Sequence, residues 1–129
     1  MTHRSRLSSI VIDCQTDDLS PHLDFWSQAL GKRVASDGSE GDGKYAELVT
    51  DRDEPIILLQ KVSHPSRVHL DIETDDVDAE AERLVALGAR KVEKIKTWWV
   101  MEAPSGHRFC VIRQQRTPFG PHVNTWPSD

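Results

Sequence analysis

The chain has 129 residues, enough for one compact domain, and 37% of them are hydrophobic and can form a core. Its formal net charge of −5 argues against a nucleic-acid or anionic-membrane partner, because no basic stripe is available to neutralise phosphates. No apolar run has the length of a membrane span, and the basic residues 1–6 lack the apolar stretch of a signal peptide. We therefore expect a cytoplasmic protein in which Cys14 and Cys110 are core residues rather than a disulfide.

The first strand and helix are predicted from alternation and capping residues. Residues 7–15 alternate loosely and are rich in Ile and Val, which favours a strand. Asp17 and Asp18 precede a helix with Pro21 in its first turn, where a missing N–H costs nothing, and Gly31 ends this helix. The apolar face expected on this helix consists of Leu19, Leu23, Trp26 and Leu30.

Three strands are expected to complete the first half. They cover residues 32–36, 45–50 and 56–62, and a glycine-rich turn at residues 37–43 separates the first two of them. Residues 63–67 link the two halves.

The sequence of the second half predicts the same order of strands and helix as the first half. Residues 68–73 form a strand, and Asp76 caps a helix that turns one apolar face toward the sheet. Three further strands are expected at residues 91–96, 97–102 and 107–114. The apolar face of this helix consists of Val77, Ala81, Leu84 and Leu87. The tail, residues 115–129, has no period and is expected to be irregular, docked by Phe119 and Trp126.

An internal repeat relates the two halves. Both helices end in the letters Ala-Leu-Gly, and four residues before each helix recur in register. These residues are Asp13, Thr16, Asp17 and Asp18 in the first copy and Asp71, Thr74, Asp75 and Asp76 in the second.

The duplication predicts a single α+β domain over residues 1–129. Its first βαβββ module covers about residues 7–62 and its second about residues 68–114. Each module alone would leave one apolar face of its sheet uncovered. We therefore expect one curved, eight-stranded mixed sheet with the helices outside and a concave cup for a ligand.

This plan resembles the glyoxalase / bleomycin-resistance / extradiol-dioxygenase superfamily, also called vicinal oxygen chelate proteins. The resemblance rests on the doubled βαβββ order, Phe25-Trp26 within the first helix, Leu-Gly at both helix ends, and Pro104-Ser105-Gly106 before the last strand. It covers nearly the whole chain, and residues 68–72 and 98–110 look most like small glyoxalase-like domains of bacteria. The resemblance implies the fold but leaves the activity open among lyases, dioxygenases, epimerases, thiol transferases and drug-binding proteins.

A divalent metal site is the first hypothesis to weigh, because metal-using members of this superfamily place ligands on strands one, four, five and eight. The matching position on strand five is His69, but its repeat equivalent on strand one is Val11, which has no donor atom. Strand four offers only Gln60, and strand eight offers Cys110 in place of a carboxylate. We therefore expect no cofactor, with a metal held by His69 and Gln60 as the alternative.

The cup can also be read without a metal. Asp13 and Asp71 can be interpreted as an acid–base pair, one of them a general base. Alternatively, they end their strands by accepting N–H bonds from the following turns. The second interpretation explains better why both copies of the repeat have the aspartate. Of the adjacent Trp98 and Trp99, one faces inward and can form an aromatic wall. Arg67 and Arg113 either hold an anionic substrate or are solvated surface residues, and the second interpretation is the commoner one for arginine. The residues expected to contact a ligand are Val11, Asp13, Leu58, Gln60, His69, Asp71, Trp98, Trp99 and Cys110.

Two functions from different classes follow from the resemblance. The first is a small-molecule binding protein, with a sequestration or resistance role and without a full catalytic metal site. The alternative is an enzyme: a metal-dependent lyase or dioxygenase using His69, or a metal-free enzyme using His69 or Asp71 as the acid–base group. A homodimer is expected, because members of this superfamily often pair.

Overall fold

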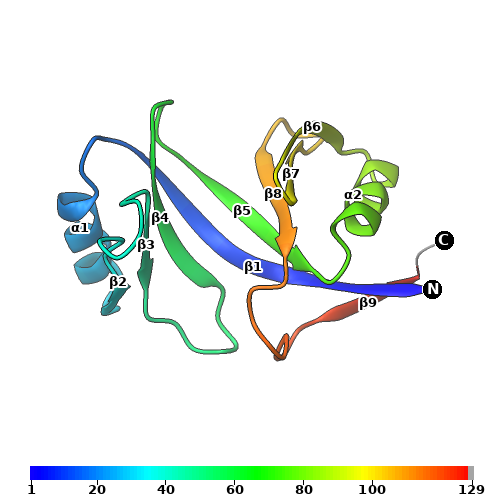
Figure 1. Ribbon diagram of the computed structural model, residues 1–129, viewed down its shortest axis with the longest axis horizontal. Helices are drawn as coiled ribbons and strands as arrows, with labels where there is room; N and C mark the ends of the chain where they lie inside the picture. The colour runs from blue at the N-terminus through cyan, green and yellow to red at the C-terminus, as the bar shows by residue number, and fades with distance from the viewer. Residues whose placement is uncertain (128–129) are drawn as a thin grey trace. The chain divides into compact units, whose positions relative to one another are not determined.

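The computed structural model describes residues 1–127, which form two α-helices and nine β-strands (Figure 1). The element order is βαβββ twice, followed by one further strand, and the strand pairs are both parallel and antiparallel. The predicted α+β fold with a mixed sheet is therefore confirmed, with a ninth strand that the sequence did not predict. Neither described helix has the length and apolar character needed to cross a membrane.

The chain divides into two compact units. Unit one consists of Met1–Ser8 together with the chain from Leu70 onward, and unit two is Ser9–His69. The long first strand, β1 (Thr2–Gln15), therefore contributes its first part to unit one and its second part to unit two. The strand β5 (Arg67–Thr74) begins at the end of unit two and continues in unit one.

Unit two has the strand order β2-β3-β4-β1 and one helix, α1 (Ser20–Leu30). Its strands are β2 (Val34–Ser36), β3 (Tyr45–Leu48), β4 (Ile56–Val62) and the second part of β1. The strands β1 and β4 are parallel, with Val11 opposite Leu58 and Asp13 opposite Gln60. The core lies between α1 and one sheet face and consists of Cys14, Leu19, Leu23, Ala46, Leu48 and Leu59. Because side chains alternate along a strand, Val11, Asp13, Leu58 and Gln60 lie on the opposite face.

The ends of α1 confirm two predictions and correct one. Gly31 adopts the left-handed conformation (φ 65°) that ends the helix, as predicted. Asp17 and Asp18 precede the helix as predicted; Leu19 is the N-cap, and Asp18 accepts a hydrogen bond from the Ser20 N–H at 3.0 Å. Leu30 is 44% exposed and does not extend the apolar face, because the helix reaches past the core at this end.

Unit one has the strand order β5-β8-β7-β6, with α2 (Val77–Ala86) packed on β6, β7 and β8. These strands are β6 (Arg90–Ile95), β7 (Trp98–Glu102) and β8 (Arg108–Arg113). Asp76 caps α2 as predicted, accepting the Ala79 N–H at 3.0 Å. Ala81, Met101 and Val111 form the core under the helix. The prediction that Leu87 faces this core is wrong, since Leu87 is 68% exposed just past the end of α2.

The sequence predicted an irregular tail, but the described part of the tail contains a strand. The strand β9 (Asn124–Pro127) pairs antiparallel with the start of β1, from Thr2 opposite Pro127 to Ser5 opposite Asn124. Phe119 is 2% exposed, and the Trp126 Nε1–H donates to Ser5 Oγ at 2.9 Å, so both expected anchors hold the tail. Residues 128–129 of the predicted tail lie outside the described residues.

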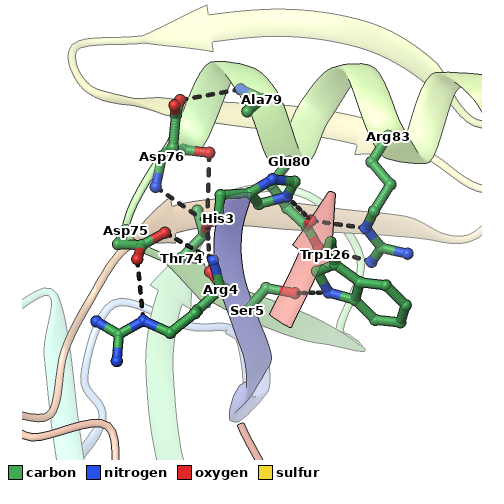
Figure 2. Close-up of polar contacts among 10 residues, drawn as sticks. All are labelled: His3, Arg4, Ser5, Thr74, Asp75, Asp76, Ala79, Glu80, Arg83 and Trp126. Carbon is green, nitrogen blue, oxygen red and sulfur yellow. Dashed lines mark hydrogen bonds and ion pairs between the residues drawn. The ribbon is translucent and has the colours of Figure 1, made fainter. Parts of the chain in front are cut away.

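A buried polar cluster holds the start of β1 to α2 (Figure 2). The His3 Nε2–H donates to Glu80 Oε1 at 2.8 Å, and the Arg83 guanidinium donates to both oxygens of the same carboxylate at 2.8 Å. The Arg83 guanidinium also lies 4.0 Å from the centroid of the Trp126 ring. His3 is 2% exposed and Glu80 is fully buried, so this cluster serves to join elements of unit one and is closed to ligands.

Candidate functional site

A hydrogen-bonded carboxylate and imidazole occupy the sheet face of unit two that α1 does not cover. Asp13, on β1, and His69, on β5, are joined by a 2.7 Å contact between Asp13 Oδ2 and His69 Nδ1. Because an ionised carboxylate can only accept, Nδ1 is the nitrogen that carries the proton. In the neutral ring Nε2 is then the acceptor nitrogen. The His69 side chain is 13% exposed, which leaves an edge of the ring accessible.

The surroundings of Asp13 add charge and an unused acceptor. Its side chain is only 2% exposed, and Arg67 Nε lies 3.7 Å from Oδ2, with the arginine side chain half exposed. Asp13 Oδ1 is buried and accepts no hydrogen bond from residues 1–127. A buried polar atom without a partner costs free energy, so each such atom calls for an explanation. One oxygen of Asp13 therefore orients His69, and the other is a buried acceptor that no described residue satisfies.

The contact of Asp13 differs from the favoured interpretation of the sequence. Asp13 was expected to accept N–H bonds from the following turn, whereas its described hydrogen bond runs to His69. Arg67 is half exposed, as a solvated arginine would be, and its Nε lies 3.7 Å from Asp13 Oδ2. The sequence could not reveal either contact, because it does not say which strand lies beside β1. The shared parity of the two repeat copies was the only available signal.

Val11, Leu58 and Gln60 lie on the same face as Asp13. Val11 stands opposite Leu58 on the paired strand, and Gln60 stands opposite Asp13. The Gln60 side-chain amide donates to the Tyr45 hydroxyl at 3.2 Å, which orients its carbonyl oxygen.

Three types of possible metal donor share this face of unit two: the His69 imidazole, the Gln60 side-chain carbonyl, and the carboxylates of Asp13 and of Glu47, which stands opposite Leu58. Val11 has no donor atom. Asp13 Oδ2 is engaged by His69, so this carboxylate would have to bind an ion through its other oxygen. A metal held by His69 and Gln60 stays a prediction.

The remaining candidate residues belong to unit one. Asp71 on β5 stands opposite Cys110 on the parallel strand β8, so their side chains share one sheet face. Asp71 is 8% exposed, and Cys110 is partly buried. Because Val100 also stands opposite Cys110, alternation along β7 places Trp98 on this face.

Trp99 lies on the other face of β7, against α2. Its indole N–H donates to Asp78 Oδ1 at 3.2 Å, and the ammonium groups of Lys91 and Lys94 lie 4.8 Å and 5.6 Å from the ring centroid. These contacts hold Trp99 in the packing of α2 on the sheet. Of the two adjacent tryptophans, Trp98 is therefore the one that shares a face with Asp71 and Cys110.

Comparisons with known proteins agree with this architecture. The family described as glyoxalase-like domain matches residues 9–112. No curated protein matches the chain. Among solved structures, methylmalonyl-CoA epimerase from Mycobacterium tuberculosis is similar with a TM-score of 0.63 at 15% identity, over 87% of this chain and 89% of that one.

Two further solved structures share the fold. A Streptomyces coelicolor methylmalonyl-CoA epimerase in complex with 2-nitronate-propionyl-CoA has a TM-score of 0.57 at 17% identity, over 86% of this chain and 98% of that one. A glyoxalase/bleomycin resistance protein/dioxygenase superfamily member from Vibrio splendidus 12B01 has a TM-score of 0.51 at 18% identity, over 82% and 98%. At these identities the likeness concerns the fold alone.

Proposed function

Since this chain belongs to the glyoxalase-like domain family, within the glyoxalase/bleomycin resistance/dioxygenase superfamily, we propose that it binds a small organic molecule on the sheet face of unit two that carries Asp13 and His69. The observation that carries the proposal is the 2.7 Å contact between Asp13 Oδ2 and His69 Nδ1. It holds Nδ1 of His69 against Asp13 and so orients the ring, and pre-oriented polar groups of this kind give a binding site its specificity.

The chemistry of this face selects for a polar, oxygen-bearing ligand. His69 Nε2 accepts from a hydroxyl or an acidic C–H or O–H group of the ligand, while the half-exposed Arg67 guanidinium attracts a carboxylate or an enolate. The apolar side chains of Val11 and Leu58, opposite each other on the same face, supply contact area for the carbon skeleton. A binding protein that retains such a compound is the simplest function of this arrangement.

Acid–base catalysis at His69 is the second candidate function. A buried carboxylate that holds the Nδ1–H of a histidine also stabilises the imidazolium that forms when Nε2 removes a proton. The neighbouring fold that is named an epimerase makes proton abstraction a reasonable class of reaction, by analogy of fold only. A metal-dependent lyase or dioxygenase stays a prediction, which stoichiometric divalent metal in purified protein would support.

The proposal can be tested by following the imidazole of His69 directly. Ring C–H signals in a ¹H–¹³C NMR spectrum, assigned with His69→Ala, are monitored while methylmalonyl-CoA, malonate and catechol are added separately. These probes represent a thioester, a dicarboxylate and an aromatic diol. We expect at least one probe to shift the His69 signals saturably and to bind at least about tenfold more weakly to His69→Ala.

Matched variants separate a binding role from a general loss of structure. Asp13→Asn keeps the shape of the side chain but removes its charge, so it should weaken the same probe, whereas His107→Ala, in the exposed turn after β7, should leave it unchanged. Catalysis is tested by deuterium exchange of methylmalonyl-CoA in D₂O, which should stop in His69→Ala. Failure of all three probes to shift His69, or equal binding by His69→Ala, would refute the proposal.

A further inference from the structure

We infer that the ends of β1 and β4 form a separate subsite in unit two that takes an anionic group, a phosphate or a carboxylate, of a small molecule. A cavity of about 470 Å³ lies there, within the size range of ligand pockets. Its lining comes from the turn after β1, the start of β3, the end of β4 and the connector that follows. The residues that line it include Asp17, Lys44, Gln60, Lys61, Ser63 and His64.

Backbone hydrogen bonds fix the walls of this cavity. The Gln15 N–H at the end of β1 donates to Ser66 Oγ at 3.0 Å, and the Gln15 side-chain amide donates to the Ser63 carbonyl at 2.9 Å. The Lys61 N–H, on β4, donates at 2.8 Å to the carbonyl of Lys44, the residue just before β3, which places the two lysines side by side. The cavity is thus held by the same strands that position Asp13, and a ligand would need little rearrangement to enter.

The charges around the cavity favour an anion. Neither the Lys44 nor the Lys61 ammonium forms an ion pair with any residue from 1 to 127, although the chain as a whole carries a net charge of −5. Asp17 is the carboxylate that lines the cavity, so with a neutral histidine the lining has an excess of one positive charge. An excess cation in an acidic protein is a local attraction for anionic ligands.

The nearby acidic side chains outside the lining are already engaged. Asp18 accepts from the Ser20 N–H, and this hydrogen bond, with smaller contributions that include the charge of Lys61, lowers the pKa of its carboxyl. Asp42 accepts from the Lys44 backbone N–H at 2.9 Å. Both carboxylates keep their negative charge, but they are held by backbone donors and neither forms an ion pair with the Lys44 or Lys61 ammonium among residues 1–127. The Lys44 ammonium lies 5.9 Å from the centroid of the Tyr45 ring.

Polar side chains in the lining can complete the recognition of an oxyanion. Ser63 brings a hydroxyl to the lining, and His64 is held there by the hydrogen bond from its Nδ1–H to the Pro65 carbonyl at 2.8 Å. Gln60 also lines the cavity, but alternation along β4 directs its side chain to the face of Asp13 and that of Lys61 to the face of Cys14. The subsite is therefore separate from the proposed ligand face, and the inference does not rest on the proposed function.

Inorganic phosphate and malonate are the probes that test the subsite. Each is titrated into the full ¹⁵N-labelled chain at an ionic strength held constant with NaCl, so that general screening does not contribute. We expect saturable amide shifts at residues 16–17, 44 and 60–64. The double variant Lys44→Gln/Lys61→Gln should raise the dissociation constant about tenfold, since it removes two charge-assisted contacts. Binding of both probes indicates a general oxyanion subsite, and binding of phosphate alone indicates a phosphate ester as the ligand group.

Controls distinguish this inference from the proposed function. Lys91→Gln/Lys94→Gln removes two lysines that are ion-paired in unit one and should not change phosphate binding. His69→Ala should also retain phosphate binding, so loss of binding in the lysine variant alone supports the subsite whether or not His69 binds a ligand. Shifts spread over the whole surface, no shift at residues 44 and 60–64, or unchanged binding by the lysine double variant would overturn the inference. The spectrum of each variant, superimposed outside the subsite, shows that it is folded.

Discussion

Removal of the Glu80 carboxylate should destabilise unit one by a large fraction of its folding free energy. Glu80 is fully buried and joins His3 to Arg83 (Figure 2). In Glu80→Ala the buried His3 Nε2–H loses its acceptor, at a cost of about 1–3 kcal/mol. The Arg83 side chain is 23% exposed and can turn to water, so its loss is discounted to about 1 kcal/mol. We expect the free energy of unfolding to fall by about 3 kcal/mol in total, whereas the free energy of unfolding of a whole domain is typically about 5–15 kcal/mol.

The assay is urea unfolding monitored by far-UV circular dichroism, for the wild type, His3→Ala, Glu80→Ala and the double variant. Since both single variants break the same hydrogen bond, their effects should not add, and the cycle should give a coupling free energy of about 1 kcal/mol. A loss of less than about 1 kcal/mol in Glu80→Ala, or strict additivity, would refute the view that this cluster is a structural bond between β1 and α2.

The same residue predicts a pH dependence. Burial alone would raise the pKa of Glu80, but the hydrogen bonds from Arg83 and His3, with smaller contributions from Ser5 and the Arg83 charge, lower it overall. The folded pKa then lies below the value of 4.5 used for an unperturbed glutamate. The contribution of the carboxylate is therefore complete above that unperturbed value and is lost as the pH falls through the folded pKa. The stability difference between wild type and Glu80→Gln should shrink on acidification, and a difference that grows would contradict this assignment.

Two further predictions concern single positions. Burial raises the pKa of the Cys14 thiol, and the negative charge of Asp13 raises it further. In the folded protein N-ethylmaleimide should therefore label Cys110 before Cys14, which mass spectrometry of the peptides would show. Faster labelling of Cys14 would contradict its burial. A Cβ at Gly38 would lie 2.2 Å from the Tyr45 carbonyl oxygen, whereas a Cβ at Gly31 meets no atom within 4 Å. Gly31→Ala should therefore lower the free energy of unfolding by about 1 kcal/mol, because of the left-handed backbone alone, and Gly38→Ala should lower it by more. Equal melting temperatures of the two variants would contradict this difference.

The sequence predicted those elements whose signals are local. The strand β4 (Ile56–Val62) was placed at its observed bounds because it is a continuous apolar run between a charged turn and a polar connector. The Asp76 cap and the left-handed Gly31 follow from capping preferences that need no tertiary information. The internal repeat then supplied the order of elements, and with it the fold.

The elements that the sequence did not predict depend on partners far along the chain. The strand β1 begins at Thr2, although residues 1–6 are polar, because His3 bonds to Glu80 and the Arg6 guanidinium donates to the carbonyls of Phe119 and Pro121. A polar segment can be buried when each group finds such a partner, but hydrophobic periodicity does not detect it. The strand β9 escaped prediction for the same reason.

The candidate site shows the same limit. Asp13 was identified from the repeat and His69 from the family resemblance, but their hydrogen bond joins residues 56 positions apart and depends on which strands are neighbours. Trp98 and Trp99 were correctly expected to point to opposite faces, since alternation is local. Which of them packs on α2 was decided by partners such as Asp78, which no local pattern reveals.

The division of β1 between the two units affects how this duplicated chain could be taken apart. Severing the connector near Ser63 would not release two intact repeats, because the fragment that follows would lack Met1–Ser8, the strand segment that belongs with it. Thr2 pairs with Pro127, so the two ends of the described chain are adjacent. A circular permutant that joins these ends through a short linker and opens at the connector would keep that segment continuous with the second repeat.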